Sequence, residues 1–236
     1  MRTLSLVVPV YNAPDLARAL VACLPELARS AETCGFTLVE TILVDDGSEA
    51  PLDLAASPDV LILRNDSNRG KGFSVKRAAL AAKGAWVLMS DVDLSAPFTE
   101  FPRLAAEADA WMVCGSRYGR PGMPLCRRLL SRIFHLLVRV VGVAGVHDTQ
   151  CGFKLFRMDV MRPVFEALRI ERFSFDVELI RRVRRAGGVV KEIPVVWHGG
   201  KRSSLRVCRD APRMLLDLLR IWRDRASSLD RTPADR

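Results

Sequence analysis

Two aspartates, Asp91 and Asp93, lie in the segment Ser90–Asp93, which directly follows the apolar run Ala85–Met89. Because alternate side chains of an extended strand point the same way, both carboxylates can converge on one cation. Oxygen ligands suit Mg²⁺ or Mn²⁺, and a metal held this way keeps open positions for the oxygens of a diphosphate. Taken alone, the spacing is equally compatible with a solvated loop. Its place after a strand favours a metal site at Asp91 and Asp93.

Two further runs of β-branched and apolar residues end in side chains suited to a nucleoside. Leu4–Val10 leads to Tyr11, and Phe36–Val44 leads to Asp45 and Asp46. In an open α/β sheet the carboxyl ends of the strands face one crevice, where a tyrosine ring can stack on a base and a carboxylate can bind base or ribose. By itself, the aspartate-glycine pair after the second run is equally consistent with a simple turn. Together the two strand ends favour a nucleotide site.

Neither of two common glycine-rich phosphate-binding motifs is present, which excludes a dinucleotide site and a Walker A site. No glycine precedes Asn12, so the GxGxxG pattern of a dinucleotide site is absent after the first strand. The segment NRGKG at 68–72 also fails as a Walker A loop, because Asn65 stands where glycine is required and Gly72 follows the lysine. What remains is Lys71 between two glycines at a predicted helix start, which is either a modest anion site or a flexible turn.

Charge is distributed unevenly along the chain. Residues 1–116 carry 10 basic and 15 acidic side chains (net −5), whereas residues 117–236 carry 26 and 12 (net +14), which together give +9. A basic second half implies an anionic partner. Nucleic acid is disfavoured, because the four tryptophans and two tyrosines do not interleave with the arginine runs, and the aspartates would repel a polyanion.

The segment Leu125–Val141 predicts a basic amphipathic helix with Arg128, Arg132 and Arg139 on one side. It can lie in a membrane interface or be an ordinary core-facing helix with a solvated arginine face. The longest apolar stretch, Ile133–Val146, is too short and too polar to span a bilayer. Because the first apolar run also lacks a cleavage site, we expect a cytoplasmic protein with neither signal peptide nor transmembrane helix.

Polar residues gather again at 147–154 (HDTQCGFK) and 173–178 (FSFDVE). His147 with Cys151 is too poor in partners for a metal site, and Asp176 with Glu178 can simply cap a helix. The six cysteines form no CxxC pair, so we predict reduced thiols rather than a disulfide framework. They are Cys23, Cys34, Cys114, Cys126, Cys151 and Cys208.

Alternating strand and helix patterns predict an α/β fold with a mainly parallel sheet. The expected strands are Leu4–Val10, Phe36–Val44, Val60–Leu63, Ala85–Met89, Ala110–Cys114 and Val189–Val196. The expected helices are Asp15–Arg29, Phe73–Lys83, Thr99–Ala108, Leu125–Val141, Phe175–Ala186 and Asp210–Ala226, with Asp15 and Thr99 as N-caps. We predict one domain over 1–226, with a nucleotide and metal half (1–116), an acceptor and membrane half (117–226) and a flexible tail (227–236).

In this order the motifs closely resemble family-2 glycosyltransferases of the GT-A fold, in particular the branch that glycosylates polyprenyl (dolichyl) phosphate. The resemblance covers about residues 4–226 and rests on VVPVYN, LVDDGS, NRGKGFSVKRA, SDVDLS, GSR, RRLLSRIF, DTQCGFKLF and FSFDVEL. The last two motifs are the more discriminating, and they look more like the glucosyl than the mannosyl branch.

The resemblance implies a role for each matched residue. Pro9, Tyr11 and Asp45 would contact the nucleoside with Asp46 close by, and Asp91 and Asp93 would bind the metal and the donor diphosphate. Lys71 would stabilise the departing nucleoside diphosphate. Ser116, Arg117, Arg128 and Arg132 would hold the acceptor phosphate, and Asp148, Gln150 and Asp176 would orient sugar or acceptor. Ala13 and Ser95 depart from residues common in the family, which leaves the base and the third metal ligand open.

The implied reaction follows from the acceptor. A lipid monophosphate is already anionic at neutral pH and needs no general base. One in-line displacement from an α-linked nucleotide sugar would give a β-linked polyprenyl phosphosugar. UDP-glucose is the favoured donor, and GDP-mannose is the second choice. We expect attachment to the cytoplasmic face of an anionic membrane, with a membrane-anchored partner or a homo-oligomer possible. The alternatives are transfer to a saccharide hydroxyl, which needs a base, and a non-enzymatic basic binding module.

Overall fold

A computed structural model describes residues 1–54, 59–117, 137–139, 141, 143, 145–198 and 207–224, with side chains in the last range from residue 212. Most of the predicted helix Leu125–Val141, including Arg128 and Arg132, lies outside the described residues. The predicted tail at 227–236 also lies outside them.

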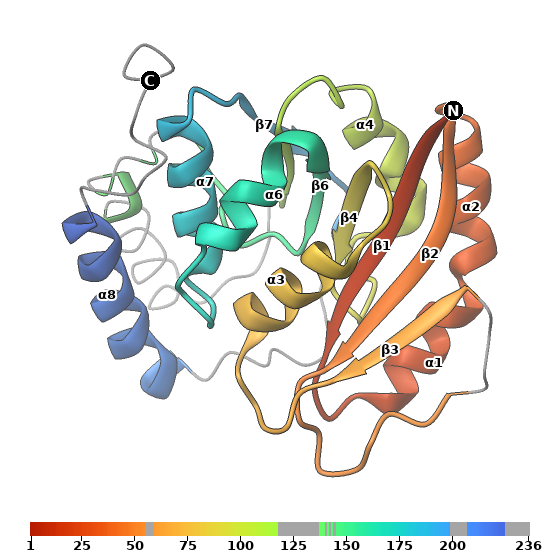
Figure 1. Cartoon of the computed structure of the whole chain (residues 1–236), viewed down its shortest axis with the longest axis horizontal. Coiled ribbons are helices and arrows are strands. Elements are labelled where there is room, and N and C mark those ends of the chain that lie inside the picture. The colour runs from red at the N-terminus through yellow and green to blue at the C-terminus, as the bar shows by residue number, and fades with distance from the viewer. Residues whose placement is uncertain are drawn as a thin grey trace.

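In the described part of the chain, seven strands form one mixed sheet in the order β3-β2-β1-β4-β6-β5-β7 (Figure 1). All neighbours are parallel except β6, which runs antiparallel to both β4 and β5. The mainly parallel sheet predicted from the sequence is confirmed. The strands are β1 (Arg2–Val10), β2 (Phe36–Asp45), β3 (Val60–Arg64), β4 (Trp86–Ser90), β5 (Met112–Ser116), β6 (Phe153–Arg157) and β7 (Val190–Pro194).

Helices cover both faces of the sheet, as the apolar composition of the strands requires. Along β1, Leu6 and Val8 pack toward one face and Val7 toward the other, because successive side chains of a strand alternate. The first face is covered by α1 (Pro14–Ala22), α2 (Leu24–Glu32), the short 3₁₀ helix η1 (Phe98–Glu100) and α4 (Phe101–Ala105). The second is covered by α3 (Lys71–Ala81), α6 (Met158–Ala167) and α7 (Phe175–Arg185), and α8 (Val207–Arg223) lies farther from the sheet, beyond α7 (Figure 1).

Two N-terminal helix predictions were wrong in detail. The expected helix Asp15–Arg29 is two helices that meet at Cys23, because Pro25, in the first turn of the second one, has no N–H with which to continue the hydrogen bonds of the first. The first begins at Pro14 with Ala13 as N-cap, so Asp15 is not the cap. Thr99 likewise lies inside η1 and does not cap α4.

Strand β6 and helix α6 were missed by the sequence analysis. The strand is only five residues long and passes directly into the helix, so its short alternation is hard to distinguish from a helix start. Pro163 inside α6 further obscures the helical pattern. The omission matters because β6, from the basic half, is inserted between β4 and β5 of the acidic half.

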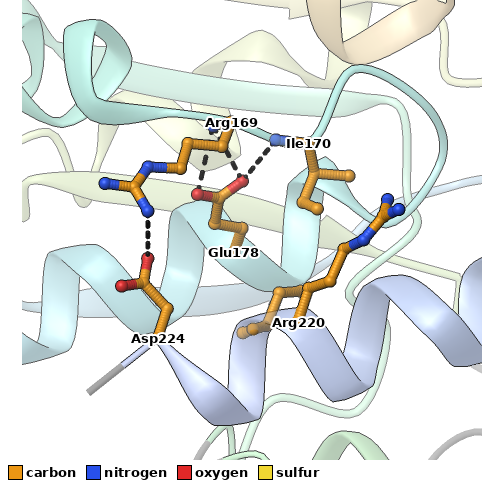
Figure 2. A pocket seen from close by; sticks show the side chains of 6 residues that line it. Arg169, Ile170, Glu178, Arg220 and Asp224 are labelled. Carbon is orange, nitrogen blue, oxygen red and sulfur yellow. Dashed lines mark hydrogen bonds and ion pairs between the residues drawn. The ribbon is translucent and has the colours of Figure 1, made fainter. Parts of the chain in front are cut away.

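Helix α8 is attached to α7 by a polar cluster (Figure 2). Glu178 of α7 accepts hydrogen bonds from the backbone N–H of Arg169 (3.1 Å) and of Ile170 (2.7 Å). Asp224, just after α8, pairs with Arg169 at 3.6 Å and with Arg182 at 3.0 Å. A pocket here contains none of the predicted site residues, and the charges of its two arginines and two carboxylates neutralise one another, so the pocket is structural. It is lined by Arg169, Ile170, Glu178, Arg220, Ile221 and Asp224.

Candidate functional site

The strand ends that carry the predicted site residues lie at one edge of the sheet. Val10 of β1 is in register with Asp45 of β2, and β4 runs parallel to β1 on its other side. Tyr11, Asp46 and Asp91 therefore all follow the carboxyl ends of adjacent parallel strands, as the sequence predicted. This edge is the ligand-binding edge of an open α/β sheet.

Asp91 lies at the centre of the site and has a cationic partner. The amine Nζ of Lys71, the first residue of α3, lies 2.6 Å from Oδ1 of Asp91. The backbone N–H of Asp91 donates to the carbonyl of Gly152 at 3.0 Å. Burial alone would raise the pKa of Asp91, but Lys71, Lys154 and Arg117 hold it below its ordinary value. The carboxylate is therefore charged across the physiological range.

Asp93 completes the carboxylate pair in a tight turn. Its Oδ1 accepts a hydrogen bond from the backbone N–H of Ser95 at 3.0 Å, and Leu94 between them has a positive φ of 48°. Both aspartates are half-buried. Among the described residues, no group of three His, Cys, Asp or Glu side chains forms a complete metal cage. Two carboxylates two residues apart supply oxygen ligands of the kind that Mg²⁺ or Mn²⁺ prefers, and such ions take the rest of their ligand shell from substrate and water.

Asp45 and Asp46, predicted to face the nucleoside, brace the loops of the site. Asp45 is fully buried and accepts hydrogen bonds from the N–H groups of Ser48 (2.9 Å) and Leu52 (3.1 Å) and from the guanidinium of Arg64. Burial would raise the pKa of Asp45, but these hydrogen bonds and the charge of Arg64 lower it.

The two carboxyl oxygens of Asp46 accept from the backbone N–H groups of Arg69 (2.9 Å) and Gly70 (2.8 Å). Asp46 thus fixes the loop that presents Lys71 to Asp91. Pro9 lies half-buried within β1, and Tyr11 is 47% exposed at the strand end, where its ring is accessible to a base. The nucleoside contacts of Pro9, Tyr11 and Asp45 stay predictions.

Arg117 and Asp148, which the sequence placed in separate motifs, form a bidentate ion pair. Nε and Nη2 of Arg117 each lie 2.5 Å from an oxygen of Asp148, and the backbone N–H of Arg117 donates to the same carboxylate at 3.0 Å. Burial would raise the pKa of Asp148, but Arg117 lowers it. The guanidinium also lies 5.1 Å from the ring centroid of Trp197. Arg117 is thereby held at the end of β5, directly after the buried Ser116.

The loop that carries Asp148 is fixed by Glu192 of β7, a residue the sequence analysis did not single out. The carboxylate of Glu192 accepts from the backbone N–H groups of His147 (2.8 Å) and Asp148 (2.7 Å). In the same loop, the side-chain amide nitrogen of Gln150 is buried and makes no hydrogen bond within the described part of the chain. The role of Gln150 in orienting sugar or acceptor stays a prediction.

A buried ion pair joins Lys154 of β6 to Asp176 of α7. Nζ of Lys154 lies 2.6 Å from Oδ1 of Asp176, and the two side chains are 0% and 2% exposed. Burial is the largest influence on the pKa of Asp176 and raises it despite the opposing charges of Lys154 and Lys71. The sequence assigned Asp176 to sugar or acceptor orientation and overlooked Lys154. A charged residue between Phe153 and Leu155 was the available signal, because a lysine in an apolar strand requires a buried partner.

The cysteines whose side chains are described are free thiols, namely Cys23, Cys34, Cys114 and Cys151. Burial raises the pKa of Cys114 to about 12 and that of Cys151 to about 11, so both stay protonated. These four thiols agree with the predicted reduced state.

The arrangement of sheet and helices is that of the GT-A glycosyltransferase fold. Glucosyl-3-phosphoglycerate synthase from Mycobacterium tuberculosis, solved with UDP, superposes with a TM-score of 0.68 at 18% identity, covering 94% of this chain and 80% of that one. Another structure of that enzyme contains Mn²⁺, UDP and phosphoglyceric acid. Mannosyl-3-phosphoglycerate synthase from Rubrobacter xylanophilus gives a TM-score of 0.67 at 19% identity, over 94% of this chain and 73% of that one. The GT-A fold expected from the motifs is confirmed.

The family model described as glycosyl transferase family 2 matches residues 5–165, and the chain belongs to this family of glycosyltransferases. A protein named dolichyl-phosphate beta-glucosyltransferase from Dictyostelium discoideum is 32% identical over 93% of this chain and 76% of its own length. One of the same name from Drosophila melanogaster is 34% identical over 93% and 74%. Within the described residues, no helix combines the length and apolarity needed to cross a bilayer.

Proposed function

We propose that this enzyme transfers glucose from UDP-glucose to polyprenyl phosphate with inversion, giving a β-linked polyprenyl phosphosugar. The names of the relatives, which align over nearly the whole chain, support both the sugar and the acceptor. GDP-mannose is the next donor to consider. The nucleotide half of the proposal draws on Tyr11 and Asp91 at adjacent strand ends.

The observation that supports a phosphate acceptor is that the carboxylates of Asp148 and Asp176 are each paired with a cationic side chain. Asp148 is held bidentately by Arg117, and Asp176 is buried against Lys154. A general base must reach the proton that it removes. Asp148 is engaged through both oxygens by Arg117, and Asp176 is only 2% exposed, so neither is arranged as such a base. A phosphate acceptor needs no base, whereas a saccharide hydroxyl does. The pairing therefore supports the phosphate acceptor over the hydroxyl.

In the proposed step an oxygen of the acceptor phosphate attacks the anomeric carbon. The bond from that carbon to the diphosphate oxygen breaks, and the nucleoside diphosphate leaves with the electron pair, so no proton is transferred. Asp148 occupies Nε and Nη2 of Arg117, so it is the positive charge of the guanidinium that is placed to orient the acceptor phosphate. Lys71 is placed to stabilise the developing charge on the diphosphate. A divalent cation held by Asp91 and Asp93 would neutralise that charge further.

An anionic membrane surface is the proposed location of the acceptor, and α8 supplies a face for it. Four apolar side chains of α8 are between 46% and 55% exposed. They are adjacent in the sequence or three to four residues apart, which places them on one face of the helix. Arg213 and Arg223 are exposed on the same helix. Apolar side chains can enter the acyl boundary while arginines contact lipid phosphates. The apolar residues are Leu215, Leu216, Leu219 and Trp222.

The test is transfer of radiolabelled sugar by the purified chain with Mn²⁺. UDP-glucose and GDP-mannose are each offered with polyprenyl phosphate in detergent micelles or with a soluble oligosaccharide. We expect label from UDP-glucose to enter the organic phase only when polyprenyl phosphate is present. Label transferred to the oligosaccharide instead would replace this proposal with a hydroxyl acceptor, and preference for GDP-mannose would change the donor alone.

A further inference from the structure

The ion pair of Lys154 and Asp176 lies entirely within the protein, at 0% and 2% exposure and a separation of 2.6 Å. Moving two charges out of water carries a large desolvation penalty, and buried pairs can often be replaced by apolar residues without loss of stability. Stability alone is therefore a weak reason for this pair. The surroundings of the pair suggest another reason, because each partner is connected to Asp91 through one intervening segment.

On one side, Lys154 connects to Asp91 through its own strand. β6 is antiparallel to β4, with Lys154 opposite Met89, and Gly152 lies beside the end of β4. The carbonyl of Gly152 accepts the N–H of Asp91, and a Cβ on Gly152 would lie 1.9 Å from Oδ2 of Asp91. Lys154 Nζ also donates to the carbonyl of Cys151, adjacent to Gly152. The lysine thus fixes the backbone against which the Asp91 carboxylate rests.

On the other side, Asp176 connects to Asp91 through two helix starts. Its neighbour Phe175 packs so closely on Gly72 that a Cβ there would lie 2.6 Å from the Cβ of Phe175. Gly72 follows Lys71 at the start of α3, and Lys71 reaches Oδ1 of Asp91. Anchoring Asp176 therefore also fixes the start of α3 and its lysine.

We propose that the buried pair Lys154–Asp176 is a positioning element that holds the Asp91 carboxylate, through Gly152 on one side and Lys71 on the other, in the orientation that binds metal and donor diphosphate. The inference rests on the proposed function in using the donor site, but it does not depend on the acceptor. Both side chains are buried, at 0% and 2% exposure, so the proposal assigns them as positioning residues that act through Asp91.

The test replaces both partners together, so that no unpaired charge is left in the interior. The double variant Lys154→Met/Asp176→Leu exchanges the ion pair for apolar side chains. We expect it to fold, with binding of Mn²⁺ in the presence of UDP, measured by calorimetry, weakened about 10- to 100-fold, and kcat lowered similarly. KM for polyprenyl phosphate should change less than twofold, a split that general loss of structure would not produce.

A matched control is Arg182→Met, which breaks another buried ion pair, 2.7 Å from Glu178 and 5% and 6% exposed, in the same helix as Asp176. We expect Arg182→Met to lower the melting temperature while leaving Mn²⁺ affinity and kcat within twofold of wild type.

A second double variant, Lys154→Gln/Asp176→Asn, keeps hydrogen bonding without charge and covers the case in which the apolar variant does not fold.

The inference is overturned if either folded double variant binds Mn²⁺ with UDP as tightly as wild type and keeps its kcat. Failure of both double variants to fold would equally overturn it, because the pair would then serve folding. Failure of the proposed function looks different. If the wild-type enzyme binds Mn²⁺ and UDP but does not glucosylate polyprenyl phosphate, only the proposed acceptor is wrong. Comparing Mn²⁺ binding by wild type and by the double variants still tests the role of the pair.

Discussion

The carboxylate of Asp91 rests directly on the Cα of Gly152, with no room between them for a side chain. A Cβ on Gly152 would lie 1.9 Å from Oδ2 and 2.1 Å from Cγ of Asp91. Such distances are far inside van der Waals contact, so one of the two groups would have to move. Gly152 is therefore required by a neighbour on another strand rather than by its own backbone conformation.

The substitution Gly152→Ala should displace Asp91 and lower kcat by roughly 100-fold, since misplacing a catalytic group by about 1 Å has an effect of that order. The measurement is steady-state sugar transfer together with calorimetric binding of Mn²⁺ in the presence of UDP. Gly35→Ala is the control. No atom lies within 4 Å of its new Cβ, but its φ of +76° makes alanine strained.

We expect Gly35→Ala to lower the free energy of unfolding by about 1 kcal/mol without changing kcat. If Gly152→Ala kept wild-type kcat, the contact between Gly152 and Asp91 would have no catalytic importance.

Removing either carboxylate of the metal site should abolish transfer. Asp91→Asn and Asp93→Asn should each lower kcat by at least about 100-fold, because each removes charge from the site that faces the diphosphate. Excess EDTA should reduce wild-type activity to the same level, and added Mn²⁺ should restore it. The exposed Asp59 provides a control, since Asp59→Asn changes the same chemical group away from the site. Full wild-type activity in excess EDTA would rule out a metal requirement.

The Arg117–Asp148 pair should make stability depend on pH. Because the folded-state pKa of Asp148 lies below its ordinary value of 3.8, its ionised form stabilises the protein above that value. This contribution is lost as the pH falls through the lower, folded-state pKa. At pH 7 we expect Asp148→Asn to lower the free energy of unfolding by roughly 3 kcal/mol.

Urea unfolding of wild type and Asp148→Asn at pH 7, 5 and 3 measures this contribution. The difference between the two proteins should be the same at pH 7 and 5 and smaller at pH 3. A difference that does not change with pH would assign the loss to packing rather than to the charge of Asp148.

Binding to anionic vesicles should depend on the exposed apolar face of α8. Leu216→Ser and Leu219→Ser should each weaken binding about tenfold, which corresponds to burial of one leucine side chain. Leu61→Ser is the matched control, because Leu61 is 44% exposed on β3. Cosedimentation with phosphatidylglycerol vesicles measures the effect, and high salt should release the protein if arginines dominate. Equal binding by all three variants would exclude α8 as the membrane contact.

Much of the site could be predicted from short segments of sequence. Tyr11, Asp46 and Asp91 each follow a run of apolar residues, and parallel strands bring such ends to one edge whatever the details of packing. Lys71 was identified by its flanking glycines. Even so, the sequence suggested direct nucleoside binding for Asp45, and the structure adds a bracing role that depends on Arg64 and Leu52, residues with no motif of their own.

By itself, the sequence determined the α/β class, the family and the chemical types available at the site, because these depend on local periodicity and on residues that lie within a few positions of one another. Only the tertiary structure decided which charges are paired. Arg117 with Asp148, Lys154 with Asp176 and Lys71 with Asp91 are each far apart along the chain. Asp148 precedes β6 and Lys154 lies in it, so their pairs form because β6 is inserted between β4 and β5, whereas Lys71 opens α3 beside the end of β4. A pairing of distant segments leaves no periodic signal in either one.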